Sequence, residues 1–285
     1  IKLFIPEFFL ILISRIPVAH IHGGETTEGA YDESLRHSIT KMSHLHFTST
    51  EKYYNRVVQM GEQPKQVFNV GAPGIDNISR LQLISRDEFE KSIDFKLNKR
   101  NLLVTFHPVT LENASAEQQF SSLLTALDDL SSTHIIFTKA NSDTGGRIIN
   151  NLIDKYVGSH PDKAIAFTTL GQIRYLSAMQ YVDGVIGNSS SGLLEAPSFK
   201  IGTVNVGDRQ KGRVKAKSII DCEPNYLDIK SAIKMLYSIE YQSGLRDIVN
   251  PYRQENTIGK IIKVIKGYPL ENILQKSFYD LSVNE

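Results

Sequence analysis

Short apolar runs alternate with amphipathic stretches along most of the chain, a pattern typical of strands that alternate with helices. In the first third, Leu35, Ile39 and Met42 recur at helical spacing. The pattern there predicts strands over residues 16–21, 45–50 and the start of 66–78, with helices from about residue 32 and over 51–61. Units of this kind build a mainly parallel sheet.

A second series of the same kind starts near residue 101. Its predicted strands are residues 101–107, 133–140, 163–169, 183–188 and 201–207, and its predicted helices are residues 116–130, 147–156, 170–182 and 192–199. Residues 82–100 are charged and carry no strong strand signal, so we expect a linker there. We therefore predict an α/β protein whose parts are a first lobe over residues 1–85, a second lobe over 98–250, and a closing helix and tail over 251–285.

The N-terminal segment is apolar enough to suggest a signal peptide or a membrane anchor. Pro6, Glu7 and Arg15 interrupt it, and the longest clean apolar run, Phe8 to Ile13, is far shorter than the roughly 20 residues of a spanning helix. No small-residue cleavage site follows. We expect a buried helix and a buried strand instead, in a chain that starts inside a domain.

Composition narrows the class of protein. The chain has 285 residues, of which 41% are hydrophobic and 22% charged, as in ordinary soluble globular proteins. Lysine and arginine number 32 against 31 acidic residues, which argues against a nucleic-acid binder that works through bulk charge. The single cysteine, Cys222, cannot form an internal disulfide and fits the cytoplasm. We expect it to be a small buried residue.

A run of hydroxyls separates a predicted strand from a predicted helix. It comprises Asn188, Ser189, Ser190, Ser191 and Gly192. A helix N-terminus with nearby hydroxyls can bind phosphate oxygens, and a glycine permits close approach. The alternative is a polar turn with a helix cap, and the run alone does not decide between the two.

A basic loop follows the next predicted strand and contains Arg209 and Arg213. Arginine matches phosphate geometry with paired donors, whereas a solvated basic loop is the alternative. Two such features at neighbouring strand ends favour an anionic ligand such as a diphosphate. Neither a P-loop nor a GxGxxG fingerprint is present, which argues against an ordinary ATPase or dehydrogenase.

Histidines and carboxylates gather after the first predicted strand, where His22, Glu25, Asp32 and Arg36 lie in one loop and its helix. Asp32 and Arg36 are four residues apart, so the arginine could orient the carboxylate, although a surface ion pair is the alternative. We interpret the group as acid–base residues and not as a metal site, because a third ligand is not identifiable.

His107 and Asn141 also follow predicted strands of the second lobe. Because the carboxyl ends of parallel strands meet at one edge of a sheet, we expect both residues beside the serine run. For His107, a purely structural hydrogen bond is the alternative.

Together these stretches resemble the hydrolysing UDP-N-acetylglucosamine 2-epimerases of bacterial sialic acid synthesis. The resemblance rests on "IPVAHIHGGE", "YDESLRHSITKMSHLHFTST", "VFNVGAPGIDNI", "FHPVT", "NSDTG", "IGNSSSGLLEAPSF", "VNVGDRQKGR" and "NPY", in this order between residues 16 and 252. It implies a GT-B-like fold of two Rossmann-type lobes that hold the nucleotide sugar in the cleft between them. It also implies self-association.

The resemblance assigns roles to the candidate residues. Ser189 and Ser190 would hold the diphosphate, Glu195 would accept the ribose hydroxyls, and Arg209 would pair with phosphate. His107 would face the diphosphate or the leaving group. Asp32 and Arg36, with the loop that holds His22 and Glu25, would face the sugar.

The reaction implied is an elimination followed by hydration. A base removes the proton from the carbon that bears the acetamido group while UDP leaves, and water then adds to 2-acetamidoglucal to give N-acetylmannosamine. No step requires a redox cofactor, and the phosphate donors offer a route without a metal.

Three alternatives remain open. The same chemistry could act on a UDP-2,4-diacetamido-2,4,6-trideoxyhexose, or a retaining glycosyltransferase could use the same two lobes. The third is an inactive fragment that still binds UDP. The family carries further residues upstream, including a GDR motif with a catalytic aspartate. We therefore expect an incomplete first lobe and, for this chain alone, weak activity or none.

Overall fold

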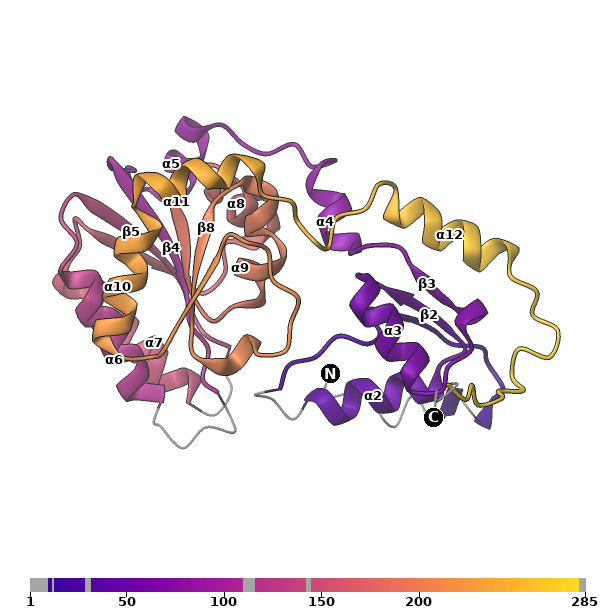
Figure 1. Cartoon of the computed structure of the whole chain (residues 1–285). Coiled ribbons are helices and arrows are strands. Elements are labelled where there is room, and N and C mark those ends of the chain that lie inside the picture. Colours follow the sequence, from indigo (N-terminus) through magenta and orange to yellow (C-terminus); the bar gives the residue numbers. More distant parts are fainter. Residues whose placement is uncertain (1–9, 12, 29–31, 110–115, 142–144, 282–285) are drawn as a thin grey trace. The chain divides into compact units, whose positions relative to one another are not determined.

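The computed structural model describes residues 10–11, 13–28, 32–109, 116–141 and 145–281. It divides the chain into two compact units, shown in Figure 1. Unit 1 consists of Ile1–Thr27, Tyr31–Ser79 and Pro251–Glu285, and unit 2 consists of Glu28–Ala30 and Arg80–Asn250.

Unit 1 contains a parallel sheet of three strands in the order β1-β2-β3. The strands are β1 (Ala19–Ile21), β2 (Leu45–Thr48) and β3 (Val67–Asn69). The helices of this part of the chain are α2 (Asp32–Met42), α3 (Glu51–Gln59), the 3-10 turn η1 (Pro64–Gln66) and α4 (Pro73–Ile78). The alternation predicted from the sequence is therefore confirmed for this unit.

The prediction that the first strand is buried is wrong. Ile21 in β1 is 43% exposed, and Ile13, in the helical residues before it, is 77% exposed. The reason is that β1 is an edge strand with β2 as its one hydrogen-bonded neighbour among the described strands. Residues 1–9 of the apolar N-terminal segment lie outside the described residues. Across the described ranges, no helix has the length and apolar character needed to cross a membrane.

The C-terminal segment packs on unit 1. Helix α12 (Thr257–Gly267), yellow in Figure 1, places Ile261 in a core with Leu45, Phe47 and Val70. Beyond this helix, the Tyr279 amide donates to the Gly61 carbonyl at 2.9 Å. Residues 251–281 thus complete the core of unit 1.

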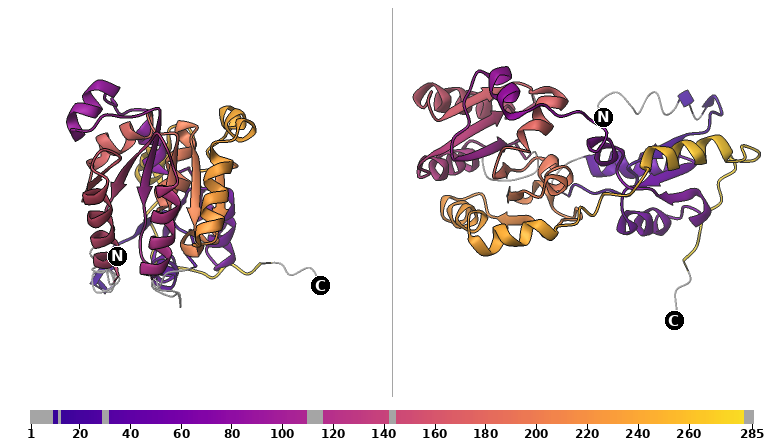
Figure 2. Two further views of the ribbon diagram at one scale, coloured as in Figure 1. Left: turned by 90° about the vertical axis from the view of Figure 1, so that its left-hand side faces the viewer. Right: turned by 90° about the horizontal axis from the view of Figure 1, so that it is seen from above.

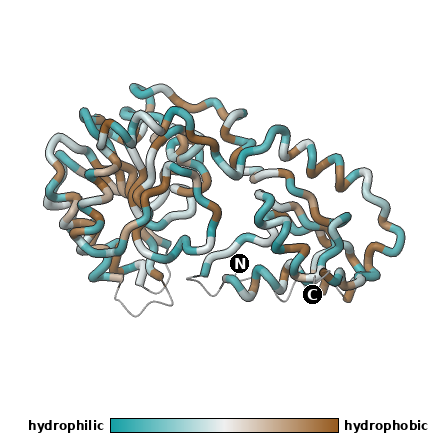
Figure 3. Tube along the Cα trace, in the orientation of Figure 1, coloured by the Kyte–Doolittle hydropathy of each residue, from teal (hydrophilic) through white to brown (hydrophobic). Residues whose placement is uncertain are grey.

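Unit 2 contains a parallel sheet of six strands in the order β6-β5-β4-β7-β8-β9. The strands are β4 (Arg100–Thr105), β5 (Thr133–Thr138), β6 (Ala164–Phe167), β7 (Gly184–Gly187), β8 (Gly202–Val206) and β9 (Ile219–Cys222). β4 lies in the middle, and its central residues Leu102, Leu103 and Val104 are fully buried. Figure 3 shows the hydrophobic colour of this sheet inside a more polar periphery.

Helices cover both faces of this sheet (Figure 2). Leu102 and Val104 point to a core built with α6 (Ala116–Asp128), α7 (Gly146–Ser159) and α10 (Tyr226–Leu236). α8 (Gly171–Ala178) and α9 (Ser190–Leu194) supply other buried residues, and α9 packs on the Thr203 face of β8. Each large apolar side chain buried in this way stabilises the fold by roughly 1.5–3 kcal/mol.

Some elements differ from the prediction. The expected linker contains helix α5 (Arg86–Ile93), which begins with a capping box and packs on α8. Strand β9, helices α10 and α11 (Ile239–Gly244), and the 3-10 turn η4 (Leu245–Asp247) were not predicted. The helix expected over residues 192–199 is instead the five-residue α9 followed by a 3-10 turn, η2 (Ala196–Phe199).

A buried carboxylate ties the elements of unit 1 together. Glu62 is 2% exposed and accepts from Lys41 Nζ at 2.6 Å, Lys276 Nζ at 2.8 Å and His46 Nε2 at 3.0 Å. Burial alone would raise the pKa of Glu62, but the three hydrogen bonds outweigh it and lower the pKa to about 2. Glu62 therefore joins α2, β2 and the C-terminal segment as an ionised group.

We expect Glu62→Gln to lower the free energy of unfolding by about 3 kcal/mol at pH 7, because the change removes the buried carboxylate that accepts from Lys41, Lys276 and His46. The pKa of Glu62 is lower in the folded protein than in the unfolded one, so its contribution is present above the ordinary value of 4.5 and is lost as the pH falls towards 2. Urea unfolding across this pH range should therefore show that the difference in free energy of unfolding between variant and wild type becomes smaller in acid. Glu271→Gln, which changes an exposed carboxyl group of the same segment, is the control. Equal losses in the two variants would contradict the prediction.

Candidate functional site

A pocket of about 320 Å³ opens where β4, β5, β6 and β7 of unit 2 end. Volumes of roughly 300–1,000 Å³ are typical of small-molecule sites. The lining residues come from four strand ends and from α8, and they are Thr105, His107, Thr138, Lys139, Thr168, Thr169, Leu170, Gly171, Gln172, Tyr175, Ser189 and Ser191. Ligands of parallel α/β sheets bind at this edge.

Hydroxyl groups dominate the lining of this pocket. Tyr175 OH is hydrogen-bonded to Ser191 Oγ, and Thr105 Oγ1 is hydrogen-bonded to Thr138 Oγ1. Burial raises the pKa of Tyr175, so its phenol is neutral near pH 7. The Lys139 ammonium is paired with Asp154 at 2.6 Å. The lining therefore offers chiefly neutral groups that both donate and accept.

Asn188 fixes the two central strand ends relative to each other. Its Oδ1 accepts from the His107 amide at 2.7 Å, and its Nδ2 donates to the His107 carbonyl at 2.8 Å. Its own carbonyl accepts from Arg209 at 2.9 Å and from Gln210 at 2.8 Å. Asn188 is completely buried. The side chain of Asn188 thus holds the backbone of His107 in place, and its contact with UDP stays a prediction.

The serine run divides into residues with different contacts. Ser189 and Ser191 line the pocket, and Ser189 caps α9 by accepting from the Ser191 amide. Ser190 is the first residue of α9. Because α9 has only five residues, its dipole is smaller than the sequence suggested. The side chain of Glu195, at the end of α9, is close enough to Tyr175 to raise the pKa of its phenol.

Gly192 is required by packing. A Cβ atom at this position would lie 2.6 Å from Thr203 Cγ2, and Thr203 Oγ1 donates to the Gly192 carbonyl at 2.8 Å. The glycine thus permits a close contact between α9 and β8, and the predicted close approach of a phosphate stays a prediction.

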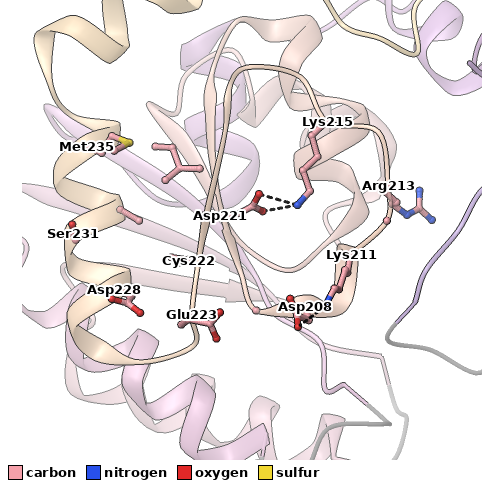
Figure 4. A pocket seen from close by; sticks show the side chains of 14 residues that line it. Asp208, Lys211, Arg213, Lys215, Asp221, Cys222, Glu223, Asp228, Ser231 and Met235 are labelled. Carbon is pink, nitrogen blue, oxygen red and sulfur yellow. Dashed lines mark hydrogen bonds and ion pairs between the residues drawn. The ribbon is translucent and has the colours of Figure 1, made fainter. Parts of the chain in front are cut away.

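The basic loop lies beside a different pocket, of about 630 Å³, between the loop, β9 and α10 (Figure 4). Lys215 Nζ lies 2.7 Å from Asp221 Oδ1, and Lys211 Nζ lies 3.6 Å from Asp208 Oδ2. Arg213 points away from this pocket in Figure 4. These two lysines thus pair with carboxylates in or beside the loop. Arg209 of the same loop instead donates to the Asn188 carbonyl, next to the first pocket.

Two other features of unit 2 stand apart from the first pocket. Asn141 is exposed beyond the end of β5, and residues 142–144 beside it lie outside the described residues. Burial, with Asp228, Asp221 and Glu223 nearby, raises the pKa of the Cys222 thiol to about 12. Cys222 therefore remains a thiol near neutral pH.

In unit 1, two of the acid–base candidates, His22 and Glu25, meet beside the ends of β1 and β2. His22 Nδ1 lies 2.7 Å from Glu25 Oε1, and Ser49 Oγ donates to the same oxygen at 2.9 Å. Glu25 and Ser49 are 3% and 1% exposed, whereas the His22 side chain is 36% exposed. The loop therefore presents an imidazole that is anchored on one side.

The loop around this cluster is held by Glu33. Its Oε1 accepts from Thr26 Oγ1 at 2.6 Å, and its Oε2 accepts from the Thr27 amide at 2.8 Å. Burial would raise the pKa of Glu33, but these bonds and His37 outweigh it and lower the pKa. Glu33 thus supports the loop as an ionised group.

Asp32 and Arg36 lie on α2, four residues apart, as predicted. The Asp32 side chain lies outside the described part of the structure. Arg36 is half-buried, and its Nε has no hydrogen-bond partner among the described residues. Arg36 is close enough to His20 to help lower the pKa of that histidine, after burial, to about 4. His20 is therefore neutral near pH 7.

Sequence reasoning missed Tyr175, Gln172 and the threonines that line the first pocket, and it missed Ser49. The threonines and Ser49 lie among the last three residues of predicted strands, so their strand-end positions could have indicated them. Tyr175 lies inside a predicted helix and carries no such signal. Within the described ranges, no three His, Cys, Asp or Glu side chains form a group that could hold a metal ion.

We expect Asn188→Ala to lower the free energy of unfolding by about 2–4 kcal/mol, because the backbone N–H and C=O of His107 lose their buried partner. The control is Asn225→Ala, which removes an exposed cap of α10 and should cost about 1 kcal/mol. Urea unfolding followed by circular dichroism measures both changes. A loss for Asn188→Ala no larger than that of the control would contradict the buried bridge.

Known proteins resemble this chain over most of its length. The family model described as UDP-N-acetylglucosamine 2-epimerase matches residues 11–266. The chain is 44% identical over 271 residues to the GDP/UDP-N,N'-diacetylbacillosamine 2-epimerase (hydrolyzing) of Campylobacter jejuni, covering 95% of this chain and 70% of that protein. It is 42% identical to the polysialic acid biosynthesis protein P7 of Escherichia coli, covering 96% and 71% of the two chains. It is 37% identical to the UDP-N,N'-diacetylbacillosamine 2-epimerase (hydrolyzing) of Legionella pneumophila, covering 92% and 68%.

Solved structures show the same fold. A putative UDP-N-acetylglucosamine 2-epimerase from Listeria monocytogenes matches with a TM-score of 0.76 at 16% identity, covering 96% of this chain and 72% of that one. The UDP-GlcNAc 2-epimerase from Neisseria meningitidis bound to UDP-GlcNAc matches with a TM-score of 0.76 at 16% identity, covering 91% and 72%. The predicted GT-B-like α/β fold with parallel sheets is confirmed. With the family match over residues 11–266, this shows that the chain belongs to the UDP-N-acetylglucosamine 2-epimerase family.

Proposed function

We propose that the protein is a hydrolysing 2-epimerase of a UDP-linked 2-acetamido sugar. The observation that carries the proposal is the meeting of His107, Ser189 and Ser191 in one pocket at the carboxyl edge of the unit 2 sheet, in a chain of this family. The anchored His22 at the corresponding edge of the unit 1 sheet adds an acid–base group.

In this proposal, unit 2 binds the UDP part of the substrate. The hydroxyls of Ser189 and Ser191 donate to diphosphate oxygens, and Glu195 accepts from the ribose hydroxyls. His107 stabilises the negative charge that develops on the diphosphate as the glycosidic bond breaks. Asn141, Ser190, Arg209 and Arg213 remain candidates for further contacts with UDP.

Unit 1 supplies acid–base chemistry to the sugar. A base removes the proton on C2, and that C–H electron pair forms the C1=C2 double bond as the C1–O bond to UDP breaks. Water then adds its hydroxyl to C1 while a proton returns to C2 on the opposite face, so the products are UDP and the 2-epimer of the free sugar. His22, Glu25, Asp32 and Arg36 are the candidates for these proton transfers and for charge stabilisation.

Two sugars are candidates, and the relatives favour one of them. The Campylobacter and Legionella relatives, 44% and 37% identical, are named for N,N'-diacetylbacillosamine, a 2,4-diacetamido-2,4,6-trideoxyhexose. A Neisseria meningitidis relative named UDP-N-acetylglucosamine 2-epimerase is 33% identical over 274 residues. We therefore propose the UDP-2,4-diacetamido sugar as the preferred substrate and UDP-N-acetylglucosamine, which would give N-acetylmannosamine for sialic acid synthesis, as the second candidate.

We expect UDP release from UDP-N,N'-diacetylbacillosamine with a kcat/KM at least about 10-fold above that for UDP-N-acetylglucosamine, since polar groups that bind the 4-acetamido group lose their partner in the other sugar. A coupled assay measures UDP released by the chain extended with the upstream residues that the family carries, and NMR in D₂O identifies the 2-epimer with deuterium at C2. Transfer of the sugar to an acceptor would indicate a glycosyltransferase instead. UDP binding by calorimetry with no turnover would indicate a binding fragment. Either result contradicts the proposal.

We expect His107→Ala and Asp32→Asn each to lower kcat by about 10²–10⁴-fold, the range of a charge-stabilising or proton-transferring group. The matched control is His134→Ala, because His134 in β5 of unit 2 hydrogen-bonds the Lys96 carbonyl outside the pocket lining. Its kcat should stay within about 2-fold of wild type. Unchanged turnover in both site variants would refute the assignment of these residues.

A further inference from the structure

We propose that Glu25 and Ser49 are positioning residues that hold the His22 imidazole with its proton on Nδ1 and present Nε2 as the proton-accepting nitrogen. This inference rests on the proposed function, since it concerns which group of unit 1 exchanges a proton with the sugar.

The hydrogen bonds at Glu25 determine the tautomer of His22. His22 Nδ1 and Ser49 Oγ lie 2.7 Å and 2.9 Å from the same carboxylate oxygen. We take Glu25 as ionised; a carboxylate accepts hydrogen bonds and does not donate them, so Nδ1 then carries the proton. In a neutral imidazole the other nitrogen, Nε2, then keeps its lone pair. A general base requires such a lone pair.

Burial gives this arrangement its rigidity. The carboxyl group of Glu25 and the hydroxyl of Ser49 are almost completely buried, whereas the imidazole of His22 is partly exposed. Ser49 directly follows β2, and His22 directly follows β1, so the two paired strands set the distance between them. The buried pair thus anchors one side of a ring whose other side can meet a ligand.

The backbone of the loop is also constrained. His22 has a φ of +65°, which is uncommon for a residue with a side chain. Its amide donates to the Phe47 carbonyl at 2.9 Å, and Arg56 donates to the Gly24 carbonyl at 2.7 Å. Gly24 has a φ of +75° and leaves no room for a Cβ atom against the Tyr53 carbonyl. These contacts therefore hold the loop backbone in the conformation that orients the His22 side chain.

The other histidines of β1 and β2 have partners inside the unit. His20 lies 3.3 Å from Thr40 Oγ1, His44 accepts from the Val18 amide at 3.0 Å, and His46 is bonded to Glu62. His44 and His46 are buried, and burial lowers the pKa of all three. Among these four, His22 is the one that combines a bond to a carboxylate with a partly exposed ring.

The first measurement is the tautomer of His22, which needs no substrate. In the intact ¹⁵N-labelled protein at pH 8, long-range ¹H–¹⁵N spectra distinguish a protonated Nδ1 from a protonated Nε2, and His22→Gln assigns the signal. We expect the Nδ1–H form in wild type and a shift towards the Nε2–H form in Glu25→Ala. An Nε2–H imidazole in wild type would overturn the inference.

The second measurement is turnover. We expect Ser49→Ala to lower kcat by about 10-fold with KM changed less than 2-fold, because the variant removes orientation and leaves substrate contacts in place. The matched control is Ser43→Ala, at the opposite end of β2, which removes a buried hydroxyl bonded to the Ile39 carbonyl at 2.8 Å. Its kcat should equal that of wild type.

Equal turnover in Ser49→Ala and Ser43→Ala, with an unchanged His22 spectrum, would overturn the inference while leaving the proposed function intact. Wild-type protein that releases no UDP from either sugar would overturn the proposed function. The tautomer measurement would then still decide whether Glu25 and Ser49 position His22.

Discussion

The candidate site of unit 2 depends on the bridge that Asn188 makes between two central strands. Gly187 has a φ of +130° and approaches the Thr105 carbonyl more closely than any residue with a Cβ atom could. This approach lets the next side chain, Asn188, use its acceptor and its donor on the backbone of His107. The Asn188 carbonyl then holds Arg209. Three strand-end loops are thereby fixed by one buried amide, and a site assembled in this way is preorganised before a ligand arrives.

In unit 1, the ion cluster that stabilises the unit and the anchor of the His22 loop lie at opposite ends of β2. The ion cluster of Glu62, Lys41 and Lys276 includes a bond from Lys276 to the Ser43 carbonyl, just before β2 starts. Ser49, which anchors the His22 loop through Glu25, comes just after β2 ends. A charge cluster at one end of a strand can therefore stabilise the unit without changing the charge balance at the other end. Carboxyl ends of parallel strands then remain available for binding, as is usual in such sheets.

The sequence predicted the order of strands and helices well, because apolar periodicity is a local property. Strand-end positions followed from that order, and they brought His107 and Ser191 to one pocket as expected. Contacts between distant residues were not predictable in the same way. Gly192 indicated close approach, but its neighbour Thr203 is set by tertiary packing. The sequence indicated a basic loop after β8, but the pairing of its Lys215 with Asp221 depends on β9, a four-residue strand that was not predicted. The closing helix was predicted, yet nothing local indicated that the partners of α12 lie in unit 1.

The neutral character of the unit 2 pocket has a consequence for the proposed reaction. The lining that the structure describes contains one lysine, and Asp154 already pairs with it. Charge-assisted bonds from free lysines would bind the UDP product about as tightly as the transition state, because both carry the anionic diphosphate. Uniform binding of this kind does not accelerate the chemical step, and it slows product release. Hydroxyl donors such as Ser191, which Tyr175 holds, together with His107, which Asn188 holds, can instead stabilise charge as it develops and still release UDP.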